Sequence, residues 1–168
     1  MDYQECRAYI DDSAKYGSVL GLDNMREMLA RLGNPQDALS YVHVAGTNGK
    51  GSVIAYLYRT LTGAGYKVGR YISPTLYSYR ERLEIAGEKI SREKFAKHVT
   101  TISQAIARMT EAGLNHPTPF EIETAIKTYP TEAIRTAFSQ TSINSKVDPP
   151  DKAKSWESGL AMISKRTV

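Results

Sequence analysis

Residues Gly46 to Ser52 have the types and the spacing that bind phosphate groups, because they read Gly-Thr-Asn-Gly-Lys-Gly-Ser. Glycines let backbone N–H groups turn toward an anion, and a helix N-terminus adds unpaired N–H groups with a partial positive charge. Lys50 brings a mobile full charge for the terminal phosphates, and Ser52 brings a hydroxyl that can lie near magnesium. The predicted nucleotide-binding residues are Gly46, Thr47, Asn48, Gly49, Lys50, Gly51 and Ser52.

The spacing within this segment departs from the strict phosphate-loop pattern G-x-x-x-x-G-K-[ST]. Val44 stands where that pattern has its first glycine, so the spacing is G-x-x-G-K-G-S. The alternative interpretation is a glycine-rich turn between a strand and a helix that binds no ligand. A turn alone rarely requires Lys followed by Gly-Ser at a helix start, and we therefore favour phosphate binding.

The elements around this segment predict a β–loop–α–β unit. Residues 41–45 are β-rich and predict a buried strand, residues 53–64 repeat apolar side chains at helical spacing, and residues 68–72 predict a second strand. Such a unit implies a right-handed crossover between a parallel pair of strands. Residues 83–90 predict a small hairpin.

Several further segments predict helices. Asp23 and Ser91 are candidate N-caps, and Gly33 and Gly113 are stop signals for the helices that follow those caps. Other helices are expected over residues 2–16 and from Phe120 onward.

The character of the chain changes after Ile126. Pro130 breaks the preceding helix, residues 131–138 predict a short helix, and residues 139–154 are typical of a linker. Residues 155–163 predict a last amphipathic turn or two. We therefore separate residues 1–126 from a divergent tail over residues 127–168.

Composition excludes several classes of protein. The 168 residues hold no run of about 18 apolar residues and no signal-peptide pattern near Met1, so we expect no membrane association. The net charge is +4, but the first 126 residues hold 15 basic and 14 acidic residues, and no basic block indicates nucleic acid. A single cysteine, Cys6, excludes an internal disulfide, and the expected location is cytoplasmic.

Residues 44–52, with 64–69 and 72–74, closely resemble the folylpolyglutamate synthase/dihydrofolate synthase family, which belongs with the Mur ligases. Further stretches that resemble this family are Leu20–Asp23, Tyr79–Ile85, Gly87–Glu88, Ile90–Ser91 and Thr118–Glu121. The resemblance covers about residues 1–126 and implies the N-terminal part of an ATP-binding domain. It implies the α/β class: a P-loop-containing, Mur-ligase-like parallel sheet with flanking helices. With two or three strands visible, we expect this sheet to be incomplete.

The resemblance also implies an activity. Such enzymes use ATP and Mg²⁺ to join L-glutamate to folate (tetrahydrofolate) or dihydropteroate through an acyl phosphate. Ser73 would be the magnesium ligand. The residues that would bind the pterin-bearing substrate are Leu20, Thr118, Pro119, Phe120 and Glu121. The partners would be these small molecules, and the chain would act as a monomer.

The tail departs from this family's pattern. In the family an acidic, Gly-rich segment with a magnesium-binding glutamate follows the helix at Phe120, and a second domain comes later. Residues 127–168 contain neither, so we interpret them as a remnant of the C-terminal domain or a non-native end, produced by an internal deletion or a frameshift. The alternative functions are a catalytically inactive nucleotide-binding remnant and a Mur-type cell-wall ligase. Tyr79–Arg82 and Thr118–Glu121 disfavour the cell-wall ligase.

Overall fold

The structure is a computed structural model that describes residues 1–17, 21–128, 136–142 and 162–164. The chain divides into two compact units. The helical unit comprises Met1–Ala38 and Ile90–Glu132, and the sheet unit comprises Leu39–Lys89 and Ala133–Val168. Among the described helices, none is both long enough and apolar enough to cross a membrane.

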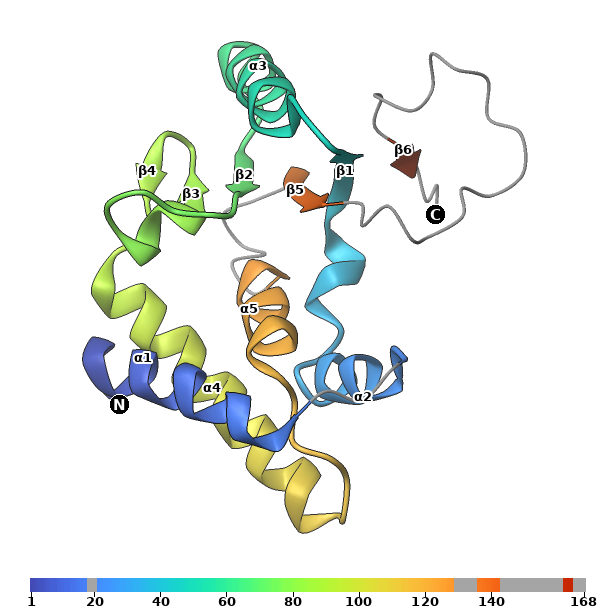
Figure 1. The fold of residues 1–168 in the computed structure, drawn as a ribbon. Helices are drawn as coiled ribbons and strands as arrows, with labels where there is room; N and C mark the ends of the chain where they lie inside the picture. The colour runs from blue at the N-terminus through green and yellow to red at the C-terminus, as the bar shows by residue number, and fades with distance from the viewer. Residues whose placement is uncertain (18–20, 129–135, 143–161, 165–168) are drawn as a thin grey trace. The chain divides into compact units, whose positions relative to one another are not determined.

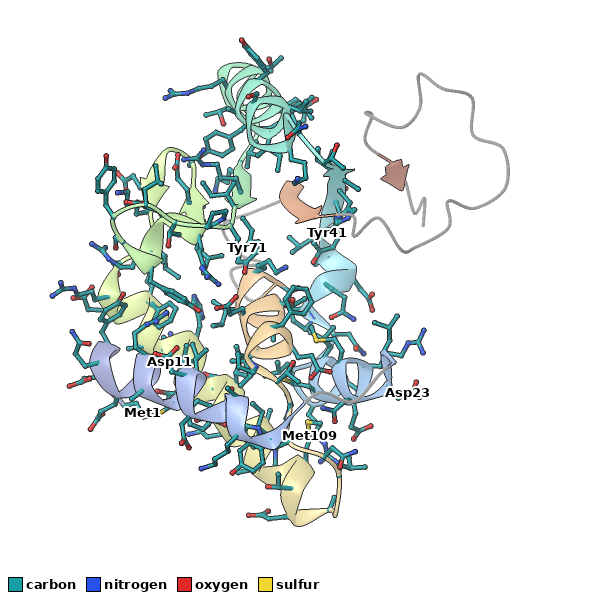
Figure 2. The ribbon with its side chains drawn as sticks, viewed as in Figure 1. Met1, Asp11, Asp23, Tyr41, Tyr71 and Met109 are labelled. Carbon is teal, nitrogen blue, oxygen red and sulfur yellow. The ribbon has the colours of Figure 1, made fainter. Side chains whose placement is uncertain are left out.

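The helical unit is organised around its longest helix, α4. Its helices are α1 (Tyr3–Asp12), α2 (Asp23–Arg31), α4 (Arg92–Glu111) and α5 (Pro119–Thr128), with 3₁₀ turns at Ser13–Tyr16 and Pro35–Ala38. Helices α1, α2 and α5 all contact α4 (Figure 1). The apolar residues of α4 that recur at steps of four and three are buried: Phe95, Val99, Ile102, Ile106 and Met109. Met109, the last of them, is labelled in Figure 2. This burial confirms the helical periodicity expected from the sequence.

Side-chain caps begin α1 and α4. Asp2 accepts the N–H of Glu5 at 2.8 Å while Glu5 accepts the N–H of Asp2 at 2.7 Å, a reciprocal capping box at α1. Ser91 accepts the N–H of Lys94 and caps α4, as predicted. The prediction for α2 was wrong by one residue, because Asp23 is the first helical residue and Leu22 holds the N-cap position. There the Asp23 carboxylate still lies at the positive end of the helix.

In the residues that the structure describes, the sheet unit contains six strands in the order β4-β3-β2-β5-β1-β6. The elements are β1 (Ser40–Gly46), α3 (Lys50–Gly63), β2 (Val68–Tyr71), a 3₁₀ turn η3 (Tyr79–Arg82), β3 (Leu83–Ile85), β4 (Glu88–Lys89), β5 (Thr136–Ser142) and β6 (Met162–Ser164). The hairpin of β3 and β4 turns at Ala86 and Gly87, as the sequence predicted. Helix α3 contacts β1, β2 and β5 (Figure 1).

Strands β5 and β6 correct three predictions. Residues 136–142 form a strand rather than the end of a helix that includes Ala137 and Phe138, or the start of a linker. This strand pairs in parallel with both β1 and β2, so β1 and β2 run parallel but are not neighbours. Ile163 likewise lies in a strand, β6, rather than in an amphipathic helical turn. The ladder to β1 supplies backbone hydrogen bonds that outweigh a weak local preference for helix.

The core of the sheet unit lies between α3 and the strands. Val44, Ile54, Tyr58 and Val68 are buried together, and partly buried apolar side chains pack around them: Val42, Val53, Leu57, Leu61 and Ile72. The sequence predicts a buried strand over residues 41–45, but within β1 only Val44 and Gly46 are buried. Burial is therefore greatest at the end of β1 that leads into the glycine-rich segment.

Candidate functional site

The segment between β1 and α3 is a tight loop that opens directly into a helix. Strand β1 ends at Gly46, α3 begins at Lys50, and Gly49 holds the N-cap position with φ +76°, a conformation that favours glycine. No described side chain caps this helix, and the first backbone bond into it runs from the Val53 N–H to the Gly49 carbonyl at 3.0 Å. The N–H groups of the first helical turn are therefore available to an anion.

Lys50 folds back over this loop. Its Nζ donates to the carbonyl oxygen of Gly46 at 2.7 Å and to that of Thr47 at 3.1 Å. The ammonium group thus lies at the mouth of the loop, beside the N-terminus of α3. Because a lysine stem is flexible, the same charge can turn from these carbonyls to a phosphate.

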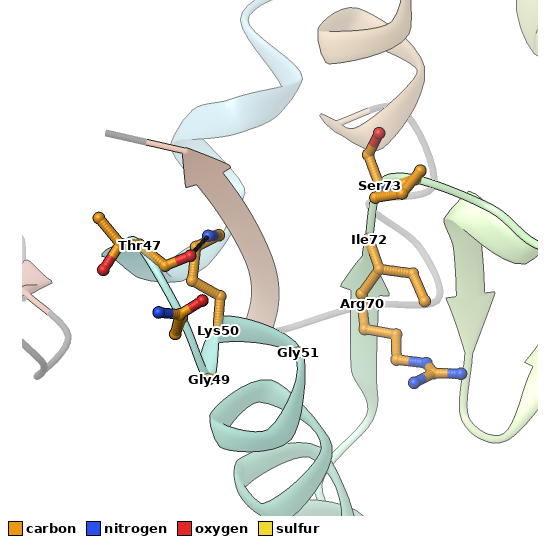
Figure 3. Close-up of a pocket in the computed structure, with 9 residues that line it drawn as sticks. Thr47, Gly49, Lys50, Gly51, Arg70, Ile72 and Ser73 are labelled. Atoms are coloured by element: carbon orange, nitrogen blue, oxygen red, sulfur yellow. Dashed lines mark hydrogen bonds between the residues drawn. The ribbon is translucent and has the colours of Figure 1, made fainter. Parts of the chain in front are cut away.

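The loop and the end of β2 line one pocket of about 330 Å³ (Figure 3). Its lining residues are Thr47, Asn48, Gly49, Lys50, Gly51, Arg70, Ile72, Ser73 and Pro74. Two regions that the sequence analysis singled out separately, the glycine-rich loop and Ser73, therefore face the same space. Gly46 and Ser52 do not line this pocket, and Ser52 is exposed on α3.

Arg70 is a pocket residue that the sequence analysis did not identify. Its Nε donates to Glu84 Oε2 at 2.9 Å on the neighbouring strand β3, and its guanidinium lies 5.4 Å from the Tyr58 ring centroid. Figure 3 shows the guanidinium directed away from the loop. The position of Arg70 in the strand after α3 could have indicated a pocket residue. The strand that follows a phosphate loop and its helix ends at the same edge of the sheet as the loop.

The pocket fits phosphates better than it fits magnesium. Magnesium beside a nucleotide usually takes one or two protein carboxylates. The described lining residues include no carboxylate, and Ser73 offers only a hydroxyl. Throughout the described ranges, no three His, Cys, Asp or Glu side chains gather as a metal site. The loop amides and Lys50 can neutralise a polyphosphate, but these residues do not complete a magnesium site.

The predicted substrate residues Thr118–Glu121 lie in the helical unit. Glu121 Oε2 accepts the N–H of Thr118 at 2.8 Å and its hydroxyl at 2.9 Å, and the Glu121 N–H donates to Thr118 Oγ1 at 3.3 Å. Pro119 opens α5, where its missing N–H costs nothing. These residues therefore form a capping box, and its [ST]-x-x-E signature was visible in the sequence. Leu20 lies outside the described residues.

Phe120 presents its ring to solvent. Phe120 is 64% exposed and therefore does not belong to the core of the helical unit. Lys127 Nζ lies 5.6 Å from the centroid of this ring. Burial lowers the pKa of Lys127 to about 8, and the nearby Glu123 carboxylate opposes that change. Phe120 therefore offers an accessible aromatic ring, and the partly buried amine of Lys127 lies near that ring.

Comparison with known proteins connects these features. No protein-family profile matches the chain. A dihydrofolate synthase/folylpolyglutamate synthase of Bacillus subtilis is 38% identical over 123 residues, which are 73% of this chain and 29% of that protein. The solved folylpolyglutamate synthetase of Lactobacillus casei superposes with a TM-score of 0.75 at 32% identity, over 83% of this chain and 36% of its own. This chain matches a segment of the folylpolyglutamate synthase/dihydrofolate synthase family.

The family match confirms the expected fold class, a partial Mur-ligase-like α/β domain. A second similar structure is a folylpolyglutamate synthase complex with AMPPCP and folate, with a TM-score of 0.72 at 31% identity over 83% of this chain and 35% of that one. The chain spans about a third or less of the length of these relatives.

Proposed function

We propose that this chain is the nucleotide-binding part of an ATP-dependent ligase that adds L-glutamate to folate (tetrahydrofolate) or dihydropteroate. The supporting observation is that the Thr47–Gly51 loop and Ser73 line one pocket in a chain that matches folylpolyglutamate synthases. Residues 1–126 would be the N-terminal part of the ATP-binding domain, and residues 127–168 its divergent tail. The chain would act as a monomer in the cytoplasm.

The reaction divides into two steps. The substrate carboxylate attacks the γ-phosphorus of ATP, which releases ADP and leaves an acyl phosphate. The amine of glutamate then attacks the acyl carbon, an amide bond forms, and phosphate and a proton leave. The loop amides and Lys50 would hold the polyphosphate and neutralise its charge, because protein work in such a step is mostly positioning. Ser73 remains the candidate hydroxyl ligand of magnesium.

The pterin-bearing substrate would bind at Thr118–Glu121. The capping box fixes this turn at the start of α5, and the exposed Phe120 ring offers a flat surface to a planar ring. A relative with a similar fold was solved with folate. The Glu121 carboxylate already accepts two hydrogen bonds from Thr118. Glu121 would therefore position this turn rather than bind the substrate directly.

A second candidate function is a nucleotide-binding segment without catalytic activity of its own. The described pocket lining has no acidic residue, and this observation favours binding without ligation by the 168 residues alone. An acyl phosphate formed in an open site would be lost to water before it met the amine.

One assay separates the two candidates. Purified chain is incubated with ATP, magnesium, glutamate and either tetrahydrofolate or dihydropteroate, and glutamylated product is followed by mass. We expect AMPPCP to bind while product stays at the no-protein level. Turnover of about 1 per second, within the ordinary enzyme range, would assign full ligase activity to these residues.

A further inference from the structure

The residues after β2 form a closed loop, residues 73–82, which we call the wall loop. The Ile72 N–H donates to the Arg82 carbonyl at 3.1 Å, so the chain leaves and re-enters the sheet at one point. Inside the loop, Glu81 Oε2 accepts two backbone N–H groups, those of Leu76 and Tyr77, each at 3.2 Å. One carboxylate therefore spans the interior of the wall loop.

Glu81 is itself anchored to the sheet. Lys89 of β4 donates from Nζ to Glu81 Oε1 at 3.1 Å, and the Glu81 side chain is only 15% exposed. The Tyr77 N–H, and after it Lys89 and the Leu76 N–H, hold the pKa of this carboxyl below its ordinary value. The charged form thus connects the middle of the loop to the hairpin of β3 and β4.

Side-chain packing contributes little at the middle of this loop. Leu76 is 83% exposed and Tyr77 is 92% exposed, so their backbone is held by the carboxylate rather than by buried apolar contacts. The same loop begins with Ser73 and Pro74, which line the pocket. The backbone that Glu81 holds at Leu76 and Tyr77 is therefore only two or three residues from Pro74, which lines the pocket.

We infer that Glu81 is a positioning residue that holds the Ser73–Pro74 wall of the nucleotide pocket. The effect on the pocket rests on the proposed nucleotide binding. The two hydrogen bonds from Leu76 and Tyr77 to Glu81, which we call the clamp, do not depend on that proposal. Glu81 acts through backbone N–H groups, so an uncharged acceptor of the same length retains part of its effect.

Three variants test this role. Glu81→Ala removes the acceptor, Glu81→Gln keeps an oxygen for the two N–H groups, and Lys89→Met removes the ion pair alone. The first measurement is the rate of native-state chymotrypsin cleavage after Leu76 and Tyr77, without nucleotide. The second is AMPPCP affinity by calorimetry. Thermal unfolding verifies that each variant is folded.

We expect Glu81→Ala to be cleaved about tenfold faster and to bind AMPPCP about threefold to tenfold more weakly. Glu81→Gln and Lys89→Met each keep an acceptor for the two N–H groups but lose the ion pair, so both should lie between the wild type and Glu81→Ala in both measurements. Equal cleavage of Glu81→Ala and the wild type overturns the clamp, and faster cleavage with unchanged affinity overturns the effect on the pocket. If the wild type bound no AMPPCP, the proposed function would fail, while faster cleavage would still support the clamp.

Discussion

Replacing Lys50 with alanine removes the one full positive charge that the loop directs at its own mouth. A charge-assisted hydrogen bond contributes about 1.5–3 kcal/mol. In this structure Lys50 Nζ must first leave the carbonyl oxygens of Gly46 and Thr47, at 2.7 and 3.1 Å, so part of that gain is offset. We therefore expect a loss of about 1.5–2 kcal/mol, which weakens nucleotide binding roughly tenfold to thirtyfold.

Calorimetric titration with AMPPCP measures this loss directly. Lys50→Gln separates charge from support of the loop, because its amide can still donate to the loop carbonyls, and we expect it to bind as weakly as Lys50→Ala. Lys67→Ala removes an equal charge from an exposed position of the same unit and should change affinity less than about twofold. Equal affinity of the wild type and Lys50→Ala, both folded, would refute the assignment of this loop.

Three further predictions concern the helical unit. Phe120→Ala should weaken folate binding more than AMPPCP binding, because it removes the exposed ring that offers a flat surface to the planar pterin. Fluorescence titration measures both affinities, with Tyr66→Ala as the exposed aromatic control. Equal losses of the two affinities would contradict the prediction. Glu121→Ala should lower the free energy of unfolding by about 1–2 kcal/mol, because the N–H and the hydroxyl of Thr118 both lose the Glu121 carboxylate as their acceptor. Urea unfolding measures this change, and an unchanged midpoint of the unfolding transition would contradict the prediction. The pKa of Lys127 is about 8 when folded against 10.5 ordinarily, so the unfolded chain binds more protons between these values and stability rises with pH there. Lys127→Met should therefore be more stable than the wild type at pH 7, by a margin that shrinks toward pH 9.5, and a constant margin would contradict this.

Local features of the fold could be predicted from the sequence because their causes lie a few residues apart. The apolar steps along α4, its cap at Ser91 and the turn at Gly87 each depend on neighbours within one or two turns. The phosphate loop is of the same kind, since glycines, lysine and the helix start are consecutive.

Long-range features could not be predicted in this way. Residues 136–142 form a strand between β1 and β2, and the register of Ser40 with Thr136 has no local signal. Arg70 likewise becomes a pocket residue only because the sheet brings the end of β2 beside the loop. By contrast, the [ST]-x-x-E pattern of Thr118 and Glu121 predicts their capping box locally, although the family resemblance implies substrate binding at the same residues.

The central claim is that a nucleotide binds where the Thr47–Gly51 loop meets Ser73. The most direct measurement is a titration of isotope-labelled chain with AMPPCP and magnesium, with each backbone amide followed by NMR. Nucleotide binding in this pocket predicts saturable shifts that are largest at Thr47–Gly51 and at Ser73. A folded chain with no saturable shifts, or with its largest shifts in the helical unit, would contradict it.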